Sequence, residues 1–231
     1  MTRLRVATYN IHAGIGRDGR FNAQRIARVI NELGAEVIAL HEVESNSGDL
    51  GALGVLAAET GLRALAGPTM LRGEATYGNA LLTRCDVSGI ERIDLSVPGR
   101  EPRGALDVRL RCRGARFRVV ATHLGLGRAE RGRQVRLLMD RFDPADTLPT
   151  VLMGDMNEWI LWSKPLRELH NRFGKTAAPA TFPAFFPLFA LDRLWVRPGN
   201  RLVSLYRHWT PLSRVASDHL PLIAEIDLPH H

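Results

Sequence analysis

The sequence predicts two β-sheets packed face to face, with the loops that follow their strands meeting at one shared edge. Two segments each read as a strand, a crossover helix and a second strand, which is the arrangement that joins parallel strands. Asn10 and Glu42 end the strands of the first segment, His123 and Asp155 end those of the second, and each pair is 32 residues apart. Two such units indicate two sheets related by a pseudo-twofold axis.

The first unit starts with an alternating strand over residues 4–9. A helix is expected over residues 22–33, because Asn22 can cap its start, apolar residues recur on one face and Gly34 can stop it. Residues 37–40 are continuous and apolar, which predicts a second, buried strand. Asn10 and Glu42 should therefore emerge at the same edge of one sheet.

A strand-rich section fills the middle of the chain. After a short helix expected over residues 53–60, alternating segments with short turns between them indicate an antiparallel meander. The expected strands cover residues 78–83, 87–95, 105–111 and 116–122.

The second unit has helical periodicity over residues 130–142 and a buried strand over residues 150–153. That strand ends in Gly154, which permits a sharp turn, and is followed by Asp155 and Asn157. Because these two side chains are two residues apart in an extended exit, they point the same way and can share one ion, water or phosphate.

The last third of the chain holds a helix that starts near Pro165 and strands over residues 191–196 and up to Asp227. Between them, four phenylalanines from Phe182 to Phe189 are interrupted by prolines, which forbid a continuous helix or a central strand. This segment is expected to be a structured loop tucked onto the core, with exposure to a ligand or lipid as the alternative.

The length fits one large domain covering residues 1–231. No apolar run approaches the roughly 20 residues that span a bilayer, and the first strand begins without a signal peptide, so a cytoplasmic protein is expected. Cys85 and Cys112 lack metal-ligand spacing and are expected to be reduced thiols, with a disulfide as the alternative.

The formal net charge is +7 and the isoelectric point about 10.3, and arginine carries almost all of the positive charge. Arginine suits phosphate recognition, and a basic field steers nucleic acid or an anionic membrane toward a protein. Genome base composition explains an excess of arginine equally well.

Eight polar residues lie at expected strand ends or in the loops beside them. They are Asn10, Glu42, His123, Asp155, Asn157, Asp192, Asp218 and His219. This oxygen-rich set suits a hard cation such as Mg²⁺ or Mn²⁺, and its two histidines suit proton transfer. A zinc site would need closely spaced histidines or thiolates, which the sequence lacks. Asp192 falls inside an apolar strand, where a carboxylate needs a partner, and His219 or His123 would serve.

Seven motifs in order resemble the endonuclease/exonuclease/phosphatase superfamily, which includes deoxyribonuclease I, abasic-site endonucleases, neutral sphingomyelinases and inositol polyphosphate phosphatases. They are T-Y-N-I-H, H-E-V, G-N-A-L-L-T-R, T-H-L-G, G-D-M-N, L-D-R-L-W-V and S-D-H-L-P-L, and they extend over residues 4–227. The resemblance points to a small bacterial branch of this family. It implies an α+β fold, a four-layer α/β/β/α sandwich of two packed mixed sheets with outer helices.

The resemblance also implies roles for individual residues. Glu42 matches the principal ligand of a Mg²⁺ or Mn²⁺ ion, and Asn10 and Asp218 match residues that hold or orient the metal site. Asp155 matches the aspartate that orients or deprotonates the attacking water, and Asn157 matches its companion on the phosphate.

His219 resembles the family histidine that bonds the phosphoryl oxygen, with Asp192 as its orienting carboxylate. His123 matches a second histidine found in the deoxyribonuclease and sphingomyelinase branches. Asn79 and Arg103 fall where substrate-contacting residues are found.

Two positions depart from the family pattern. His41 stands where a glutamine usually precedes the metal glutamate, where it could change the orientation of the site or simply pack. No carboxylate that would orient His123 can be assigned, because Glu74 and Glu101 are only positional guesses.

The expected activity is that of a metal-dependent phosphodiesterase, with in-line attack by an activated water and nucleic acid among the substrates. The alternatives are a sphingomyelinase-type enzyme that contacts membrane phospholipid through the phenylalanine segment, a phosphomonoesterase, and a binding module without catalysis. No obligate protein partner is expected, and the terminal His230 and His231 are left out of the site.

Overall fold

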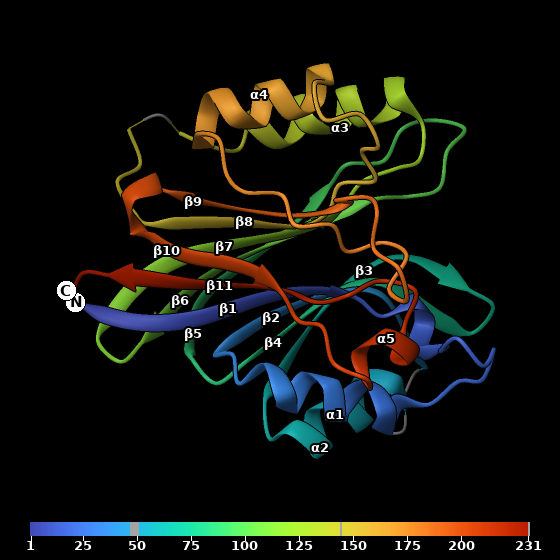
Figure 1. Ribbon diagram of the computed structural model, residues 1–231. Helices are drawn as coiled ribbons and strands as arrows, with labels where there is room; N and C mark the ends of the chain where they lie inside the picture. The colour runs from blue at the N-terminus through green and yellow to red at the C-terminus, as the bar shows by residue number, and fades with distance from the viewer. Residues whose placement is uncertain (47–50, 144, 231) are drawn as a thin grey trace.

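Two β-sheets pack face to face, and helices cover the outer face of each (Figure 1). The computed structural model describes residues 1–46, 51–143 and 145–230, so His231 falls outside it. From one side to the other, the layers are helices, a six-stranded sheet, a five-stranded sheet and helices. This arrangement confirms the predicted α/β/β/α sandwich.

The first sheet contains the N-terminal and C-terminal strands. Its members are β1 (Thr2–Asn10), β2 (Val37–Asn46), β3 (Arg63–Arg72), β4 (Ala75–Thr83), β10 (Leu202–Arg207) and β11 (Leu222–Leu228). Their spatial order is β10-β11-β1-β2-β4-β3. β1 and β2 are parallel, as predicted, and their register places Asn10 beside His41. The other neighbours are antiparallel.

The second sheet is formed by the middle of the chain. Its members are β5 (Asp86–Asp94), β6 (Gly104–Cys112), β7 (Ala115–His123), β8 (Thr150–Asp155) and β9 (Asp192–Arg197), which are neighbours in that order. β7 and β8 are the parallel pair, and His123 lies beside Asp155 in their register. The two predicted strand-helix-strand units are thereby confirmed, one in each sheet.

Four helices form the outer layers (Figure 1). α1 (Ala23–Leu33) and α2 (Ala52–Thr60) cover the first sheet, and α3 (Arg128–Met139) and α4 (Lys164–Phe173) cover the second. The other helical segments are short: η1 (His12–Gly14), η2 (Gly199–Arg201) and α5 (Ser213–Ala216). As predicted, α1 is capped by the Asn22 side chain and ends at Gly34, whose φ of 57° suits glycine.

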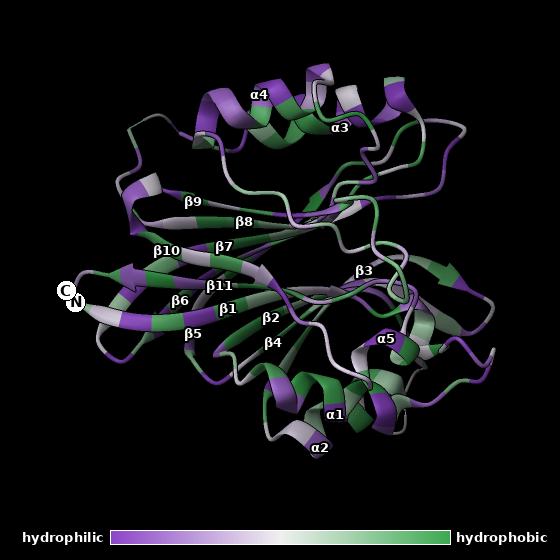
Figure 2. Ribbon diagram, viewed as in Figure 1, coloured by the Kyte–Doolittle hydropathy of each residue, from purple (hydrophilic) through white to green (hydrophobic). Residues whose placement is uncertain are grey.

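Apolar residues fill the three spaces between the four layers. Figure 2 shows hydrophobic residues along the strands of both sheets. Phe117, on β7, is fully buried between the sheets, and Trp195, on β9, is fully buried beneath α3 and α4. Truncating a side chain of this size to alanine in a close-packed core costs about 3–5 kcal/mol. The core thus holds the two sheets in the register that brings their strand ends together.

The predicted meander is wrong in one respect, because its strands belong to two different sheets. β4 pairs with β2 and β3 in the first sheet, whereas β5, β6 and β7 form the meander of the second. Alternation of apolar residues shows which side of a strand is buried, but not which sheet the strand joins. β3 and β10 were not expected, since both are partly exposed edge strands without clear alternation.

The expectation of reduced cysteines is also wrong: Cys85 and Cys112 form a disulfide. Cys85 follows β4 in the first sheet and Cys112 ends β6 in the second, and their Cα atoms are 4.7 Å apart. They are 27 residues apart in the chain. Because the stacking of the sheets creates their proximity, the spacing in the sequence could not reveal it.

The phenylalanine segment is a loop without continuous helix or strand, as predicted; its base is held on the core, where Thr181 and Ala184 are buried, but its tip is not. Phe182 and Phe189 form an isolated bridge. Phe185, Phe186 and Leu188, between them, are exposed. The hydrogen bonds of this segment close a turn on itself, which lifts these side chains away from the sheet. No helix in the described part of the chain is long and apolar enough to cross a membrane.

Candidate active site

The carboxyl ends of the four parallel strands bring polar residues from both sheets into contact. The Asn10 amide nitrogen donates to Glu42 Oε1 at 2.9 Å and to Asp155 Oδ2 at 3.0 Å. Asn10 Oδ1 accepts from the backbone N–H of His12 at 3.0 Å. These three contacts fix the direction of the amide, so Asn10 links a carboxylate of the first sheet to a carboxylate of the second.

Glu42 reaches this position because β2 is irregular there. The pairing of β2 with β4 shifts between Leu40 and Val43, and Glu42 has a φ of 58°. A bulge of this kind turns a side chain away from the direction that strand alternation would give it. A positive φ is uncommon in a residue other than glycine and is typical of functional positions.

Asp155 ends β8 at the centre of the site and is 1% exposed. A Cβ atom on Gly154 would lie only 1.8 Å from the carbonyl oxygen of Thr122, so only glycine allows β8 to approach β7 this closely. Asp155 Oδ1 accepts from the backbone N–H of Asn157 at 2.8 Å. Burial raises the pKa of Asp155 to about 6, because desolvation disfavours the charged carboxylate.

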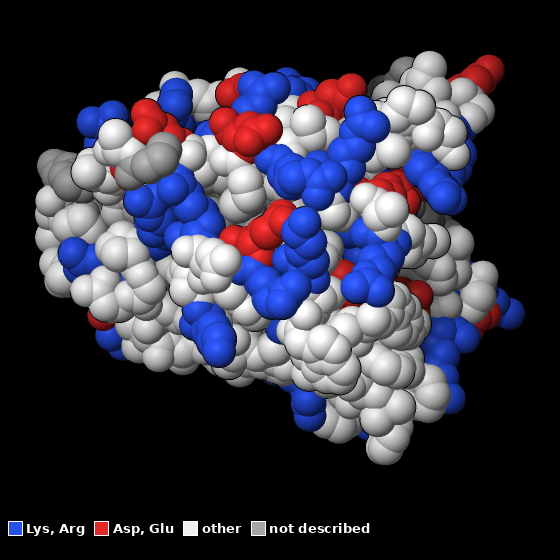
Figure 3. Space-filling view, turned by 90° about the horizontal axis from the view of Figure 1, so that it is seen from above, with Lys and Arg blue, Asp and Glu red and all other residues white. Residues whose placement is uncertain are grey.

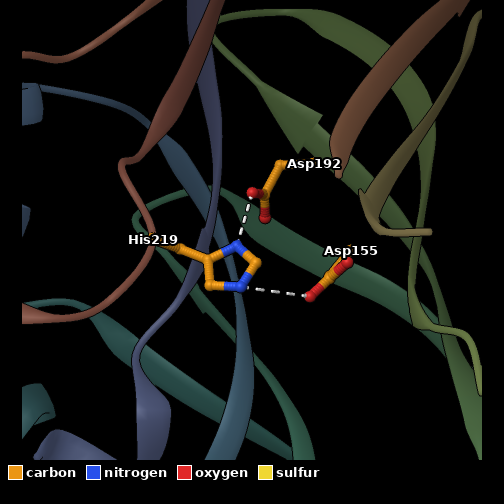
Figure 4. Close-up of side chains that lie close together, drawn as sticks. All are labelled: Asp155, Asp192 and His219. Atoms are coloured by element: carbon orange, nitrogen blue, oxygen red, sulfur yellow. Dashed lines mark hydrogen bonds and ion pairs between the residues drawn. The ribbon is translucent and has the colours of Figure 1, made fainter. Parts of the chain in front are cut away.

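His219 lies between two carboxylates (Figure 4). Its Nδ1 is 2.8 Å from Asp192 Oδ2, and its Nε2 is 3.7 Å from Asp155 Oδ2. Burial opposes a charge on the ring, but Asp192 and Asp155 outweigh it and raise the pKa of His219 to about 10. The prediction that Asp192 pairs with a histidine is confirmed, and His219 is that partner.

His123 approaches the same oxygen from the other side but has different partners. Its Nε2 is 3.6 Å from Asp155 Oδ2 and 2.9 Å from the Asn157 amide nitrogen. Its Nδ1 is 3.1 Å from Arg103 Nη1. Burial, together with the charge of Arg103, holds the pKa of His123 well below the usual range for histidine.

Neither carboxylate considered for His123 touches its ring. Glu101 pairs with Arg103 at 3.1 Å and therefore acts on His123 only through the guanidinium. Glu74 lies exposed in the turn between β3 and β4. The His123 Nδ1 atom therefore contacts Arg103, not a carboxylate.

The two predicted substrate-contacting residues, Asn79 and Arg103, are both buried. Asn79 Oδ1 is 2.9 Å from His41 Nδ1, and its amide nitrogen donates to the carbonyl oxygen of Gly104 at 2.9 Å. His41 Nε2 is 2.8 Å from Thr8 Oγ1. Asn79 contacts the ring of His41, and Arg103 contacts the ring of His123. Asn79, on β4, also links the two sheets through its bond to Gly104 on β6. The contact of Asn79 and Arg103 with substrate stays a prediction.

Glu42, Asn10 and Asp218 were expected at a metal site. Asn10 uses its amide to orient the carboxylates, which leaves the carboxylates as ligands. Asp218 is half-exposed, with Oδ1 3.8 Å from His12 Nδ1 and 3.3 Å from Ser217 Oγ. Carboxylate oxygens at the edge of a protein site fit a hard divalent cation.

Among the described residues, a different group has metal-ligand spacing. Asp155, Asp192 and His219 are all buried, and one ligand atom from each lies within 4.8 Å of the others. Within this group His219 Nδ1 bonds Asp192 Oδ2, and His219 Nε2 faces Asp155 Oδ2.

Two residues of the site were missed from the sequence. Thr181 Oγ1 donates to Asp192 Oδ2, and Ser217 Oγ donates to the carbonyl oxygen of Asn10 at 2.8 Å. Ser217 directly precedes Asp218 in the last motif, which was a usable signal. Thr181 lies in an irregular segment where no pattern identifies it.

A groove of about 370 Å³ opens beside Asp218. The loop after β1, the phenylalanine segment and α5 line it, including Arg17, Phe182, Phe185 and Arg214. The Arg17 guanidinium lies 4.6 Å from the centre of the Phe185 ring. The groove offers apolar and cationic surface next to the charged site.

The chain is similar in sequence to known proteins. Residues 7–219 match the sequence profile of the Endonuclease/Exonuclease/phosphatase family. The chain is 30% identical to the uncharacterized protein YbhP of Escherichia coli K12 over 97% of its own length and 96% of that protein.

Solved structures share the fold. An endonuclease/exonuclease/phosphatase from Beutenbergia cavernae superposes with a TM-score of 0.81 at 23% identity, covering 98% of this chain and 72% of that one. A mannosyl-6-phosphatase from Bacteroides thetaiotaomicron superposes with a TM-score of 0.73 at 18% identity, covering 97% of this chain and all of that one.

Proposed function

The chain belongs to the endonuclease/exonuclease/phosphatase family, and from this premise we propose that it hydrolyses phosphoric esters with the aid of a divalent metal, acting as a phosphodiesterase. One observation carries the proposal. Asp155 Oδ2 lies 3.6 and 3.7 Å from the Nε2 atoms of His123 and His219, and Asn10 joins the same oxygen to Glu42. A water and a phosphoryl group placed there would meet a base, a cationic donor and a neutral imidazole together.

Each residue has a distinct task in this proposal. Asp155, ionised above a pKa of about 6, orients the attacking water and accepts its proton. His219, charged at neutral pH, donates to a phosphoryl oxygen or to the leaving oxygen, and Asp192 holds its ring in place. The Asn157 amide nitrogen donates to the carbonyl oxygen of Leu124 at 2.8 Å and lies 2.9 Å from His123 Nε2, so it positions the His123 ring beside the phosphoryl group.

Glu42 and Asp218 would hold the metal, with Asn10 orienting Glu42. When bound, Mg²⁺ or Mn²⁺ supplies positive charge to the phosphoryl oxygens and lowers the pKa of a coordinated water.

The substrate class separates two candidates. A nucleic acid is favoured by the net charge of +7. A phospholipid is favoured by the exposed phenylalanine segment beside the groove. A phosphomonoester, as in the name of the Bacteroides neighbour, is the next candidate, and a module without catalysis is the weakest because the site residues are all present.

The predicted cytoplasmic location stays a prediction. The Cys85–Cys112 disulfide weighs against it, because reducing compartments keep most protein thiols free.

Hydrolysis of bis-p-nitrophenyl phosphate with Mg²⁺, with Mn²⁺ and with EDTA tests the proposal. We expect metal-dependent turnover that is lost in Glu42→Ala and in His219→Ala. Glu44→Ala, two residues further along β2, and His208→Ala, which pairs with Glu32 at the surface, are the matched controls and should retain activity. Metal-independent turnover, or full activity in either site variant, would refute the mechanism.

Absence of turnover with any metal would redirect the test to phosphomonoesters. If phosphomonoesters were not hydrolysed either, a binding module without catalysis would be the favoured function.

A further inference from the structure

Three loops around the site expose large apolar side chains. Leu126 follows β7, residues 159–162 (Trp-Ile-Leu-Trp) follow β8, and residues 185–189 precede β9, all at the end of the sandwich where the active site opens (Figure 1). We call these residues the apolar rim. Leu126 is 72%, Trp162 77% and Phe186 61% exposed. Soluble proteins seldom gather so much apolar surface without a partner for it.

The rim is continuous with the active site. The Trp159 ring packs at 5.7 Å from Phe182 and at 4.8 Å from Phe189, so the second and third loops touch. Phe182 in turn lies 4.9 Å, ring to ring, from the proposed proton donor His219. Whatever covers the rim therefore lies next to the reacting groups.

A buried ion pair fixes the bases of the first two loops. The Arg131 Nε and Nη2 atoms donate to the Glu158 carboxylate at 3.2 and 3.3 Å, and both residues are at most 4% exposed. Arg131 Nη1 donates to the carbonyl oxygen of Leu126 at 2.6 Å, and Glu158 Oε1 accepts from the N–H of Ile160 at 3.1 Å. The chain thus positions the exposed side chains instead of leaving them on free loops.

Cationic side chains surround the rim. Arg128 and Lys164 are exposed at the first residues of α3 and α4, directly after the first two loops. Arg17 stacks on Phe185, and Arg214 donates to the carbonyl oxygen of Phe185 at 3.2 Å. Figure 3, which looks onto α3 and α4, shows Lys and Arg spread over this face and a large area without charge beside them.

We propose that the apolar rim docks on the surface of an anionic phospholipid bilayer, with the active site facing the headgroups. Tryptophan and phenylalanine on loops, next to arginine and lysine, form the composition that enters the boundary between headgroups and acyl chains. The positive charge complements the anionic lipid, because the negative potential of such a surface attracts basic side chains close to it.

Single-stranded nucleic acid is the competing ligand, because aromatic side chains also stack on bases. The rim does not favour it, since Leu126, Ile160, Leu161 and Leu188 have no ring to stack and would lie exposed beside a nucleotide. Aliphatic side chains instead gain free energy on entering the lipid in proportion to the apolar area they bury.

The proposal deepens the phosphodiesterase assignment by naming a headgroup phosphoester as substrate class, and only this last step rests on that function. Docking itself is tested without catalysis, by co-sedimentation of the full chain with vesicles of phosphatidylcholine alone or mixed with phosphatidylglycerol, in EDTA. We expect binding to the mixed vesicles and a loss of at least about tenfold in Trp162→Ser/Phe186→Ser. Val203→Ser, at an exposed apolar position outside the rim on the edge strand β10, is the control and should bind as wild type.

Thermal unfolding of the double variant checks that the fold is retained. Arg128→Gln/Lys164→Gln should weaken binding to the mixed vesicles and leave any binding to neutral vesicles unchanged. Equal binding by the double variant and wild type, or no wild-type binding to either vesicle, would overturn the proposal. So would tighter binding of a single-stranded oligonucleotide that is lost in the same double variant.

Hydrolysis of the soluble diester by wild type is recorded separately. If wild type did not hydrolyse the diester, the proposed phosphodiesterase activity would be refuted, but the result on membrane docking would still hold.

Discussion

The two histidines of the site face the same oxygen of Asp155, but their other ring nitrogens contact partners of opposite charge. The Nε2 atoms of His219 and His123 lie 3.7 and 3.6 Å from Asp155 Oδ2. Behind His219 is the carboxylate of Asp192 at 2.8 Å, whereas behind His123 is the guanidinium of Arg103 at 3.1 Å. The pKa of His219 rises to about 10, and that of His123 falls well below its usual range, where burial and Arg103 both act against a charge.

Two histidines at nearly the same distance from Asp155 thus differ in charge because the side chains on their other ring nitrogens differ. His219 has a proton to give at neutral pH and a carboxylate that stabilises the charged ring. The two side chains within hydrogen-bond distance of the His123 ring nitrogens, Arg103 and Asn157, both approach with N–H donors. His123 is therefore suited to a neutral hydrogen-bonding role, and our proposal gives the donation of a proton to His219.

The largest contrast is expected from matching substitutions of the two rings. His219→Gln should lower kcat for bis-p-nitrophenyl phosphate about 1,000-fold, because it removes the only charged proton donor of the pair. His123→Gln should lower kcat about tenfold, since a glutamine amide still offers a hydrogen bond. Equal losses of kcat at the two positions would show that the two histidines do not have different roles.

The pH profile should separate the partners. For wild type, kcat/KM should rise as Asp155 ionises, at a pH no higher than about 6 because a bound cation lowers that pKa, and fall as His219 loses its proton near pH 10. Asp192→Asn removes the carboxylate that raises the pKa of His219, so the alkaline fall should move down by about 2 pH units or more. An alkaline fall that stays in place would show that Asp192 only packs.

Substituting Arg103 tests the other partner. Arg103→Gln removes a positive charge from beside His123, so the pKa of His123 should rise, although burial still holds it below the usual value, and a further ionisation should enter the acid side of the pH profile of kcat. Glu101→Gln, which keeps Arg103 but removes its ion pair, is the control and should add no such ionisation. A profile unchanged by Arg103→Gln would mean that burial alone keeps His123 neutral.

The smallest effect is expected at His41. This buried histidine bonds Thr8 and Asn79, and its ring lies 6.0 Å from that of His123. Glutamine can accept from the Thr8 hydroxyl and bond Asn79, so His41→Gln should change kcat/KM by less than about threefold. A large loss would show that His41 orients Glu42 as well as filling space.

The sequence was sufficient to predict the frame of the site. Period-2 strands, crossover helices and the caps at Asn22 and Gly34 are local signals, and the equal spacing of the two units placed Asn10, Glu42, His123 and Asp155 at one edge. The pairing of Asp192 followed from the cost of burying an unpaired carboxylate, which limited its partner to a histidine.

What the sequence could not predict depends on contacts between sheets and between loops. Arg103 lies in the loop before β6 and contacts His123 at the end of the neighbouring strand β7. Cys85 meets Cys112 only because the sheets stack. The exposure of Phe186 likewise depends on the path of a loop closed by its own hydrogen bonds. Such contacts have no periodic signature in the chain.

The most direct test of the central claim is a titration of the histidine rings by ¹⁵N NMR between pH 5.5 and 9, with signals assigned through His219→Gln and His123→Gln. We expect the His219 ring to carry a proton on both nitrogens throughout this range, and the His123 ring to carry only one. A neutral His219 at pH 7, or a His123 that becomes charged above pH 6, would contradict the central claim.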